Sequence, residues 1–256
     1  MSRHALFDLH GHVALVTGGN GGIGLGMARG LARAGAALAI WGRDQEKNRR
    51  AVAELRELGA DAEAFQCDVA SEESVCTQVA RTLERFGRID SCFANAGTWK
   101  ASPFTSMTLE DWEAVLRVNL GGAFLVFREV VKHMIDRGGG GKLVAVGSIG
   151  AIHGMPRHEN YSASKAGLCA LIRSLAVELA RHDIQANAIL PGWVATDMTA
   201  ELRKWRKLDE TVRARTPARR WGTPEDFEAV AVYLASPASR FHTGDVLRID
   251  GGYAVF

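Results

Sequence analysis

A turn crowded with glycine constrains this chain more than any other feature. The segment Val13–Gly24 reads VALVTGGNGGIG, a short apolar run that breaks into glycines. A diphosphate can approach a backbone closely only where side chains are absent and positive φ is allowed, and glycine meets both conditions. The next segment, Ile23–Ala34, is rich in Ala, Leu and Met. A helix there would turn free N–H groups and its positive dipole end toward the anion. The pattern predicts a buried strand, a phosphate-binding turn and the start of a helix.

Two glycine registers fit this turn. The dinucleotide fingerprint GxGxxG is matched by Gly19, Gly21 and Gly24. The different spacing TGxxxGxG is matched by Thr17, Gly18, Gly22 and Gly24. The glycines alone do not decide between them, and an ordinary strand-to-helix turn without a ligand is the alternative.

Length and charge bound the class of protein. A chain of 256 residues with 47% apolar content can bury a substantial core. It contains no Pro/Ser-rich linker, internal repeat or low-complexity tract, so we expect a single domain over residues 1–256. A formal charge of +2 gives no reason to expect nucleic acid, which usually needs a strongly basic face. No run approaches the roughly 18 apolar residues that a membrane span requires.

Cysteine spacing and the N-terminus favour a cytoplasmic protein. The four cysteines are scattered without a CxxC pair, which predicts neither a zinc site nor a disulfide framework. The N-terminal segment, residues 1–11, contains Asp8 and lacks a long apolar core, which argues against a signal peptide. We therefore expect a reduced, cytosolic setting and no bound metal.

Strand and helix patterns alternate along the rest of the chain. Further strands are expected at Ala37–Trp41, Ala62–Gln66, Ile89–Ala94, Lys142–Gly147, Ile184–Leu190 and around Val246–Ile249. Helical patterns occupy Gln45–Leu58, Glu72–Arg85, Leu109–Ile135 and Ser162–Arg181. This order predicts an α/β fold, a Rossmann-type doubly wound parallel sheet of about seven strands with helices on both faces.

The end of the second strand bears on the choice of cofactor. In this architecture an acidic side chain there binds the ribose 2′-hydroxyl, and an arginine accommodates a 2′-phosphate. The acid is expected at Gly42, and Arg43 follows it. This favours NADP(H) over NAD(H). Asp44 leaves an alternative, because it is either the acid in a shifted register or the N-cap of the next helix.

The ends of the third and fourth strands supply further candidates. Asp68, followed by Val69, would lie at the rim of the adenine pocket or would serve as a turn or cap. Asn95, Ala96 and Gly97 follow the fourth strand and are small enough for a ligand to approach the backbone. Asn95 could instead only join neighbouring strands by hydrogen bonds.

Ser148, Tyr161 and Lys165 form the chemical constellation. Tyr161 and Lys165 are four residues apart, so on a helix they share a face. A free tyrosine titrates near about 10, and a nearby cation favours the phenolate and lowers that value. Tyr161 would then be a general acid for ketone reduction and a general base for alcohol oxidation. Ser148 can hydrogen-bond the substrate oxygen. A YxxxK pair in isolation is more often structural.

The pair is not isolated, and the chain as a whole resembles the short-chain dehydrogenase/reductase family. The resemblance rests on motifs that occur in the family's order along essentially the whole chain: Thr17-Gly18-xxx-Gly22-Ile23-Gly24, Asn95-Ala96-Gly97, Asn119, Ser148, Tyr161-xxx-Lys165 and Pro191-Gly192. It favours the glycine register that begins at Thr17.

The resemblance implies roles for these residues. Ser148, Tyr161 and Lys165 look like the catalytic triad, Lys165 also binding the nicotinamide ribose, and Asn119 looks like a fourth member that bends its helix and holds a proton-relaying water. Thr196 would reach the carboxamide or the diphosphate. The expected cofactor-binding residues are Thr17, Gly18, Asn20, Gly22, Ile23, Gly24, Arg43, Asp68, Val69, Asn95, Ala96, Gly97, Tyr161, Lys165, Pro191, Gly192, Val194 and Thr196.

Two positions depart from the family's pattern. NADP-dependent members often carry a basic residue where this chain has Gly21, so one expected phosphate partner is missing. The serine that usually precedes the catalytic one is Gly147 here. Neither departure affects the reaction class.

Substrate choice should lie between the sixth strand and Thr223. Residues from about 194 to 222 look like a helical lid that closes over the substrate and excludes water. Its many cations either attract an anionic substrate, such as a sugar acid or a phosphopantetheine thioester, or form a solvated, ion-paired face. The expected substrate-contacting residues are Ser148, His153, Met155, His158 and Trp193.

Assembly and competing functions complete the predictions. The family commonly forms homotetramers through its two long helices and last strand, and we expect the same here. The leading function is hydride transfer between NADP(H) and a secondary alcohol or ketone. The alternatives are an NAD(H)-dependent sugar or polyol dehydrogenase and a non-catalytic nucleotide sensor. The complete catalytic set argues against the sensor, because binding alone needs no proton-transfer group.

Overall fold

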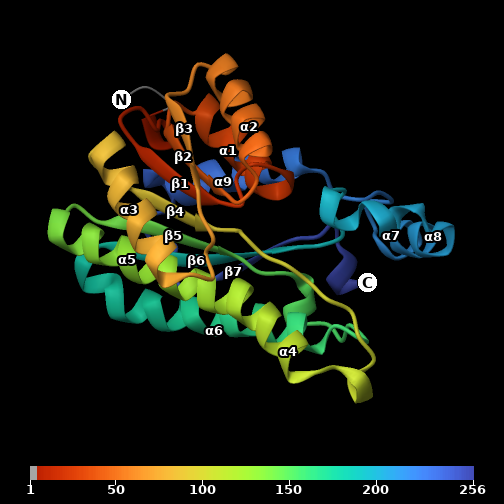
Figure 1. Cartoon of the computed structure of the whole chain (residues 1–256). Helices are drawn as coiled ribbons and strands as arrows, with labels where there is room; N and C mark the ends of the chain where they lie inside the picture. Colours follow the sequence, from red (N-terminus) through yellow and green to blue (C-terminus); the bar gives the residue numbers. More distant parts are fainter. Residues whose placement is uncertain (1–4) are drawn as a thin grey trace.

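Seven parallel strands form one sheet in the computed structural model, which describes residues 5–256 (Figure 1). Residues 1–4, part of the segment that argues against a signal peptide, lie outside that range. The strands are β1 (Val13–Thr17), β2 (Ala37–Gly42), β3 (Ala62–Gln66), β4 (Ser91–Ala94), β5 (Gly141–Val146), β6 (Ile184–Pro191) and β7 (Val246–Ile249). Their order across the sheet is β3-β2-β1-β4-β5-β6-β7. The predicted fold class is confirmed.

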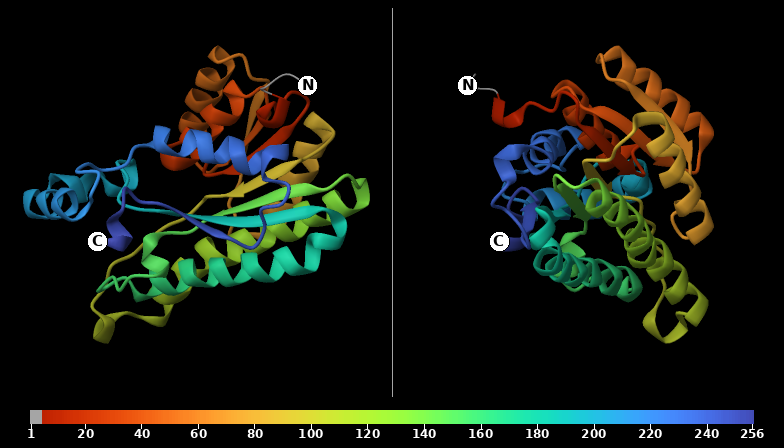
Figure 2. Two further views of the ribbon diagram at one scale, coloured as in Figure 1. Left: turned by 180° about the vertical axis from the view of Figure 1, so that it is seen from behind. Right: turned by 90° about the vertical axis from the view of Figure 1, so that its left-hand side faces the viewer.

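Two layers of helices cover the sheet. The main helices are α1 (Gly22–Arg33), α2 (Gln45–Glu57), α3 (Glu72–Phe86), α4 (Leu109–Leu116), α5 (Gly122–Arg137), α6 (Glu159–Leu179), α7 (Ala200–Lys204), α8 (Arg206–Arg215) and α9 (Glu228–Ala235). Helices α1, α2 and α9 pack on one face and α3, α5 and α6 on the other (Figure 2). Because strand side chains alternate between faces, Leu15 enters the core under α5 and α6, whereas Val16 enters the core under α1 and α9. None of the described helices is long and apolar enough to cross a bilayer.

Glycines in α1 allow close approach of the C-terminal part of the chain. A Cβ at Gly26 would lie 2.1 Å from the carbonyl oxygen of Pro224, and one at Gly30 would lie 2.6 Å from that of Glu228. The helix therefore packs backbone to backbone against the segment that begins α9.

The predicted helix over Leu109–Ile135 is wrong in one respect, because the structure divides it. A π-helical turn, Arg117–Gly121, separates α4 from α5. Asn119 lies in this turn and is 1% exposed, with its side chain bonded to the backbone of Thr98. These tertiary bonds hold the wider turn, which the helical spacing of apolar residues does not reveal.

The segment 194–222 leaves the body of the protein and returns to the same point. Figures 1 and 2 show α7 and α8 projecting beyond the sheet. Val194 and Gly222 form a parallel bridge at its base. The N–H of Ala195 donates to Gly222 O at 2.9 Å, and the N–H of Gly222 donates to Trp193 O at 2.8 Å. Two short helices thus stand on a fixed base beside the carboxyl ends of the strands.

Candidate active site

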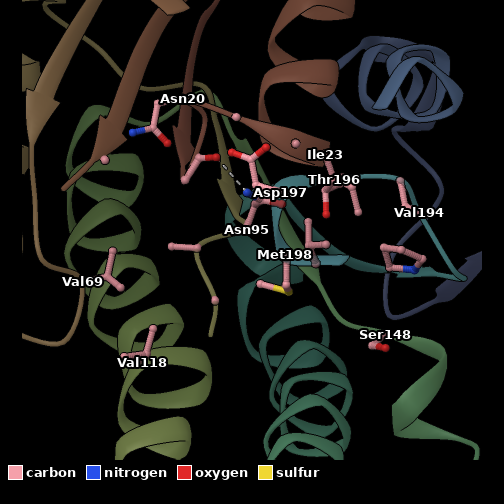
Figure 3. Close-up of a pocket in the computed structure, with 18 of the residues that line it drawn as sticks. Asn20, Ile23, Val69, Asn95, Val118, Ser148, Val194, Thr196, Asp197 and Met198 are labelled. Atoms are coloured by element: carbon pink, nitrogen blue, oxygen red, sulfur yellow. Dashed lines mark hydrogen bonds between the residues drawn. The ribbon is translucent and has the colours of Figure 1, made fainter. Parts of the chain in front are cut away.

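A cavity of about 470 Å³ opens at the carboxyl ends of the strands (Figure 3). It lies where β1 and β4 are neighbours, the point at which successive crossovers run in opposite directions across the sheet. Open α/β sheets bind ligands in the crevice at such a point. The glycine turn before α1 lines one wall, and Ser148, Tyr161 and Lys165 line another.

Backbone geometry explains the glycines of the turn. Gly18 and Gly22 have φ of +62° and +51°, which disfavour any side chain. A Cβ at Gly24 would lie 2.3 Å from Gly18 O, so this position must be glycine for α1 to pack on the turn. Gly22 opens α1, whose free N–H groups therefore point at the cavity.

Thr17 and Asn95 join β1 to β4 beneath the turn. Thr17 Oγ1 accepts from the N–H groups of Asn95 and Ala96, each at 3.0 Å. Asn95 Nδ2 donates to Thr17 O at 3.0 Å and to Gly18 O at 3.2 Å. The strand-joining role considered for Asn95 is therefore present in the structure. Asn95 also lines the cavity, whereas Thr17 is buried below it and, like Gly24, does not line it.

Two asparagine side chains occupy the space beside Gly42 at the end of β2. A Cβ at Gly42 would lie 2.2 Å from Asn20 Nδ2 and 2.5 Å from Asn48 Oδ1. Those two asparagines are bonded to each other at 2.7 Å, and Asn48 Nδ2 also donates to Gly42 O at 3.0 Å. The place where an NAD-type acid would stand is filled by amides.

Arg43 and Asp44 follow at the rim of the same cavity. Asp44 is the N-cap of α2, its carboxylate accepting from the N–H groups of Glu46 and Lys47. These bonds hold the pKa of Asp44 below its usual value. Arg43 is exposed, and its guanidinium has no hydrogen-bond partner within residues 5–256. Of the two readings of Asp44, the N-cap is the one present here.

Asp68 and Val69 line the cavity beyond β3. Asp68 Oδ1 accepts from the N–H of Ala70 at 3.0 Å, which makes a local turn. The carboxylate is exposed. Asp68 therefore lies at the rim of the cavity and also forms a local turn, so both of the expected positions are found together.

The catalytic candidates converge at the other end of the cavity. Ser148 follows β5, and Tyr161 lies in the first turn of α6. Lys165, one turn later, is 4% exposed and donates from Nζ to Val146 O at 2.8 Å. Its Nζ lies 5.7 Å from the centre of the Tyr161 ring. The structure thus brings together the three residues that the sequence singles out.

Burial governs the acid–base properties of this group. Desolvation raises the pKa of the Tyr161 phenol, and a hydrogen bond with Ser148 opposes that rise. Desolvation also lowers the pKa of the Lys165 ammonium to about 8. The pKa of Tyr161 is thus raised in the protein alone, opposite to the lowering by Lys165 that the sequence led us to expect.

Asn119 stands behind the catalytic residues instead of lining the cavity. Its Oδ1 accepts from Thr98 N–H at 2.8 Å, and its Nδ2 donates to Thr98 O at 2.9 Å and Ser164 Oγ at 3.0 Å. A Cβ at Gly97 would lie 3.2 Å from Asn119 Oδ1 and 3.4 Å from Lys165 Nζ. Gly97 therefore separates the amide from the lysine by the width of one small residue.

The segment after β6 closes the cavity opposite the turn. Pro191, Gly192, Val194 and Thr196 all line it, as expected. A Cβ at Gly192 would lie 2.7 Å from Asp250 Cα, so glycine is needed where this segment passes the C-terminal turn. Thr196 Cγ2 lies 3.2 Å from the position of a Cβ on Gly22, which places it directly across from the start of α1.

Four substrate candidates do not line this cavity. His158 stacks on Trp99 with ring centres 4.9 Å apart, and His153 meets the edge of Tyr253 at 6.1 Å. Trp193 packs edge-on against Trp221 at 5.5 Å. The fourth, Met155, lies beside Gly150, with Sδ 2.7 Å from where a Cβ there would stand. Of the five expected substrate contacts, only Ser148 lines the described cavity.

Several lining residues were not predicted from the sequence: Trp41, Lys47, Cys67, Val118, Val146, Asp197 and Met198. Trp41, Cys67 and Val146 stand at or just beyond strand carboxyl ends, and that position alone could have identified them. Lys47 and Asp197 carry no such signal. Within residues 5–256 no cluster of three or more His, Cys, Asp or Glu side chains could hold a metal ion.

Most of the cations of segment 194–222 contact the side chain of another residue. Lys204 pairs with Glu201 at 2.6 Å, Arg206 with Glu210 at 2.7 Å and Arg213 with Asp209 at 2.9 Å. Arg203 and Arg215 lie over the rings of Trp221 and Tyr253. The ion-paired face, one of the two readings of this charge run, accounts for these side chains.

The fold, this cavity and the similarities that follow define an NAD(P)-dependent oxidoreductase that acts on CH–OH groups. A family model described as enoyl-(acyl carrier protein) reductase matches residues 18–254. A gluconate 5-dehydrogenase of Gluconobacter oxydans is 37% identical over 100% of this chain and 99% of its own length. A 5-keto-D-gluconate 5-reductase of Escherichia coli is 37% identical over 98% of each chain. The crystal structure of a gluconate 5-dehydrogenase from Burkholderia cenocepacia in complex with NADP and tartrate is 36% identical, covers 99% of each chain and has a TM-score of 0.94. The chain belongs to the short-chain dehydrogenase/reductase family.

Proposed function

We propose that this protein interconverts a secondary hydroxyl group and a ketone on a sugar acid, using NADP(H). The observation that carries the proposal is the full-length similarity to gluconate 5-dehydrogenases and 5-keto-D-gluconate reductases, together with a complete Ser148, Tyr161 and Lys165 group in the cavity. When bound, the cofactor would donate or accept the hydride at nicotinamide C4.

The residues fit a dinucleotide along the whole cavity. The glycine turn leaves backbone N–H groups free for a diphosphate, and a side chain at Gly22 would crowd Thr196. Two observations on this chain support NADP(H). Asn20 and Asn48 occupy the space beside Gly42 where an acidic side chain would lie, and the guanidinium of the next residue, Arg43, has no partner among the described residues. The NADP complex of the Burkholderia relative supports the same cofactor. The N-cap bonds of Asp44 weigh against NAD(H).

Each catalytic side chain has a task that its position allows. Ser148 would hydrogen-bond the substrate oxygen and hold it beside the Tyr161 phenol. Tyr161 would donate its proton to the ketone oxygen in reduction and remove the hydroxyl proton in oxidation. Lys165, held by Val146 O, would place positive charge near the phenol and reach the ribose. Asn119, one small residue away, would position the water that reprotonates Lys165.

Segment 194–222 would act as the lid, within a single domain of residues 1–256. Its closed base, Val194 to Gly222, supports motion of α7 and α8 as one unit. We place His153, Met155, His158 and Trp193 around the substrate only after closure, because they do not line the described cavity.

Assembly and location are further parts of the proposal. The outer faces of α5 and α6 carry exposed Phe124 and Val177, and β7 is an edge strand, which supports a homotetramer formed through these elements. A monomer mass in sedimentation equilibrium would overturn it. The four free cysteines fit a reducing cytoplasm, which fractionation of the source cells would test.

Tyr161→Phe tests the reaction. With 5-keto-D-gluconate and NADPH, and with D-gluconate and NADP⁺, we expect kcat to fall by about 10²–10⁴-fold, because general acid–base catalysis is lost. NADPH binding, followed by nicotinamide fluorescence, should be retained. Tyr233→Phe is the matched control, since the Tyr233 hydroxyl bonds only His242 and lies outside the cavity.

Other outcomes separate the alternatives. Near-normal turnover by folded Tyr161→Phe would refute the mechanism. Turnover by the wild type with NADH but not NADPH would favour the NAD(H)-dependent dehydrogenase. Binding of NADPH without its oxidation across a broad carbonyl panel would favour the sensor.

A further inference from the structure

An ion pair crosses the rim of the cavity and joins two segments far apart in sequence. Lys47, in the first turn of α2, donates from Nζ to Asp197 Oδ2 at 2.6 Å. Asp197 is the first residue of the turn that leads into α7, at the start of segment 194–222. Both residues line the cavity, and Figure 3 shows Asp197 beside Thr196, on the side toward Asn20.

Lys47 is four residues beyond Arg43 in the sequence, and both line the cavity. Asn48, the next residue, accepts a hydrogen bond at its Oδ1 from Nδ2 of Asn20 in the glycine turn, at 2.7 Å. This bond fixes the start of α2 against the turn. A Cβ on Gly21 would meet nothing within 4 Å. The turn itself therefore supplies no cation here, although there is space for one, and Lys47 is a cation that lines the same cavity.

The pair is weak enough to exchange. The side chain of Asp197 is 83% exposed and that of Lys47 is 41% exposed. Ion pairs this open to water contribute little to stability. A phosphate dianion offers Lys47 more charge and more acceptor oxygens than one carboxylate does.

We propose that Lys47 is a second contact for the cofactor's 2′-phosphate and that Asp197 competes with that phosphate for Lys47. The inference rests on the proposed NADP(H) preference. A cofactor with a 2′-phosphate would take Lys47 from Asp197 and detach the start of segment 194–222 from α2. NAD(H), which lacks this phosphate, would leave the pair intact.

Titration calorimetry with adenosine 2′,5′-bisphosphate and AMP isolates the 2′-phosphate, since the two ligands differ only in that group. Lys47→Ala should weaken the bisphosphate by about tenfold, or about 1.4 kcal/mol, and leave AMP unchanged. Asp197→Asn should strengthen the bisphosphate by about three- to tenfold, again without an effect on AMP.

Matched variants control for general charge effects. Arg49→Ala removes another cation of α2, paired with Glu46, and Glu201→Gln removes another exposed, ion-paired acid of segment 194–222. Neither lines the cavity, so neither should change the preference for the bisphosphate by more than about twofold. In the Lys47→Ala background the gain from Asp197→Asn should largely disappear, since the two effects share one interaction.

The possible failures are distinguishable. A wild type that binds the bisphosphate no better than AMP would overturn the NADP(H) proposal itself. A wild-type preference that collapses in Arg43→Ala but persists in Lys47→Ala would overturn only the role of Lys47. Weaker bisphosphate binding by Asp197→Asn would show that Asp197 positions Lys47 and does not compete for it, which also overturns the inference.

Discussion

Lys165, the proposed catalytic lysine, opposes folding at neutral pH. The residue is 4% exposed, and burial lowers the pKa of its ammonium to about 8, against 10.5 for a free lysine. The folded state therefore binds fewer protons than the unfolded state between these values. By linkage, the stability of the protein rises with pH in this window, and at pH 7 the buried charge opposes folding.

Lys165→Met should remove both activity and this penalty. Between pH 7 and 9 we expect the wild type to gain about 1.4 kcal/mol relative to the variant, because the ammonium loses its proton near pH 8 in the folded state only. Urea unfolding at the two pH values measures the difference. Parallel pH profiles for wild type and variant would contradict it.

At the level of residues, the sequence predicted that Ser148, Tyr161 and Lys165 lie together, and the structure brings all three to one cavity. The family resemblance carried that prediction, together with the spacing of four residues that puts Tyr161 and Lys165 on one face of a helix. The N-cap bonds of Asp44 decided between its two interpretations, whereas the bond between Asn20 and Asn48 beside Gly42 had no signal in the sequence. The pairing of Lys47 with Asp197 spans 150 positions, and no spacing rule links them.

Among the elements, α1 depends most on the absence of side chains. Gly26 and Gly30 leave room for the backbone of Pro224 and Glu228 to lie directly against the helix. Glycine is a poor helix former, about 1 kcal/mol worse than alanine in a helix interior. Their presence in α1 therefore reflects packing and not helix propensity.

Gly30→Ala should destabilise the protein by about 1–3 kcal/mol despite the better helix propensity of alanine, since the new methyl group would overlap Glu228 backbone atoms. Chemical denaturation at pH 7 measures the effect. Gly154→Ala, where a Cβ meets nothing within 4 Å, is the matched control and should be nearly neutral. A Gly30→Ala variant as stable as the wild type would mean that α9 can move away at little cost.

Element boundaries were predictable where caps and strand ends mark them. Asp44 and Ser71 cap α2 and α3 at the expected starts. The apolar spacing did not predict the π turn at Arg117–Gly121, because it is compatible with one continuous helix, and only the family resemblance implied a bend at Asn119. What sets the turn is the bonding of Asn119 to Thr98, which lies on a different part of the chain.

For the whole molecule, the amino ends of the strands set the response to acid. His12 Nε2 is bonded to Ser91 Oγ at 2.9 Å and joins the start of β1 to β4, while Asp90 Oδ2 accepts from Val13 N–H at 2.9 Å. Burial lowers the pKa of His12 from 6.5 to about 4. The unfolded state therefore binds more protons than the folded state between these values, and stability falls as the pH falls through them.

The wild type should lose about 2 kcal/mol between pH 7 and pH 5 relative to His12→Gln, which cannot take up the proton. Thermal or urea unfolding of both proteins at the two pH values gives this difference. Equal losses would show that His12 titrates normally and that other groups control acid unfolding.

The bridge between Val194 and Gly222 closes segment 194–222 at its base, so that the segment can be replaced as a unit. Because its two ends are already held together by the body of the protein, lengthening the segment costs loop-closure entropy that grows only slowly with length. Variation in α7 and α8 can therefore proceed without disturbing the sheet or the glycine turn. Under the proposed function, replacing this segment, about one tenth of the chain, would change the substrate and leave Ser148, Tyr161 and Lys165 in place.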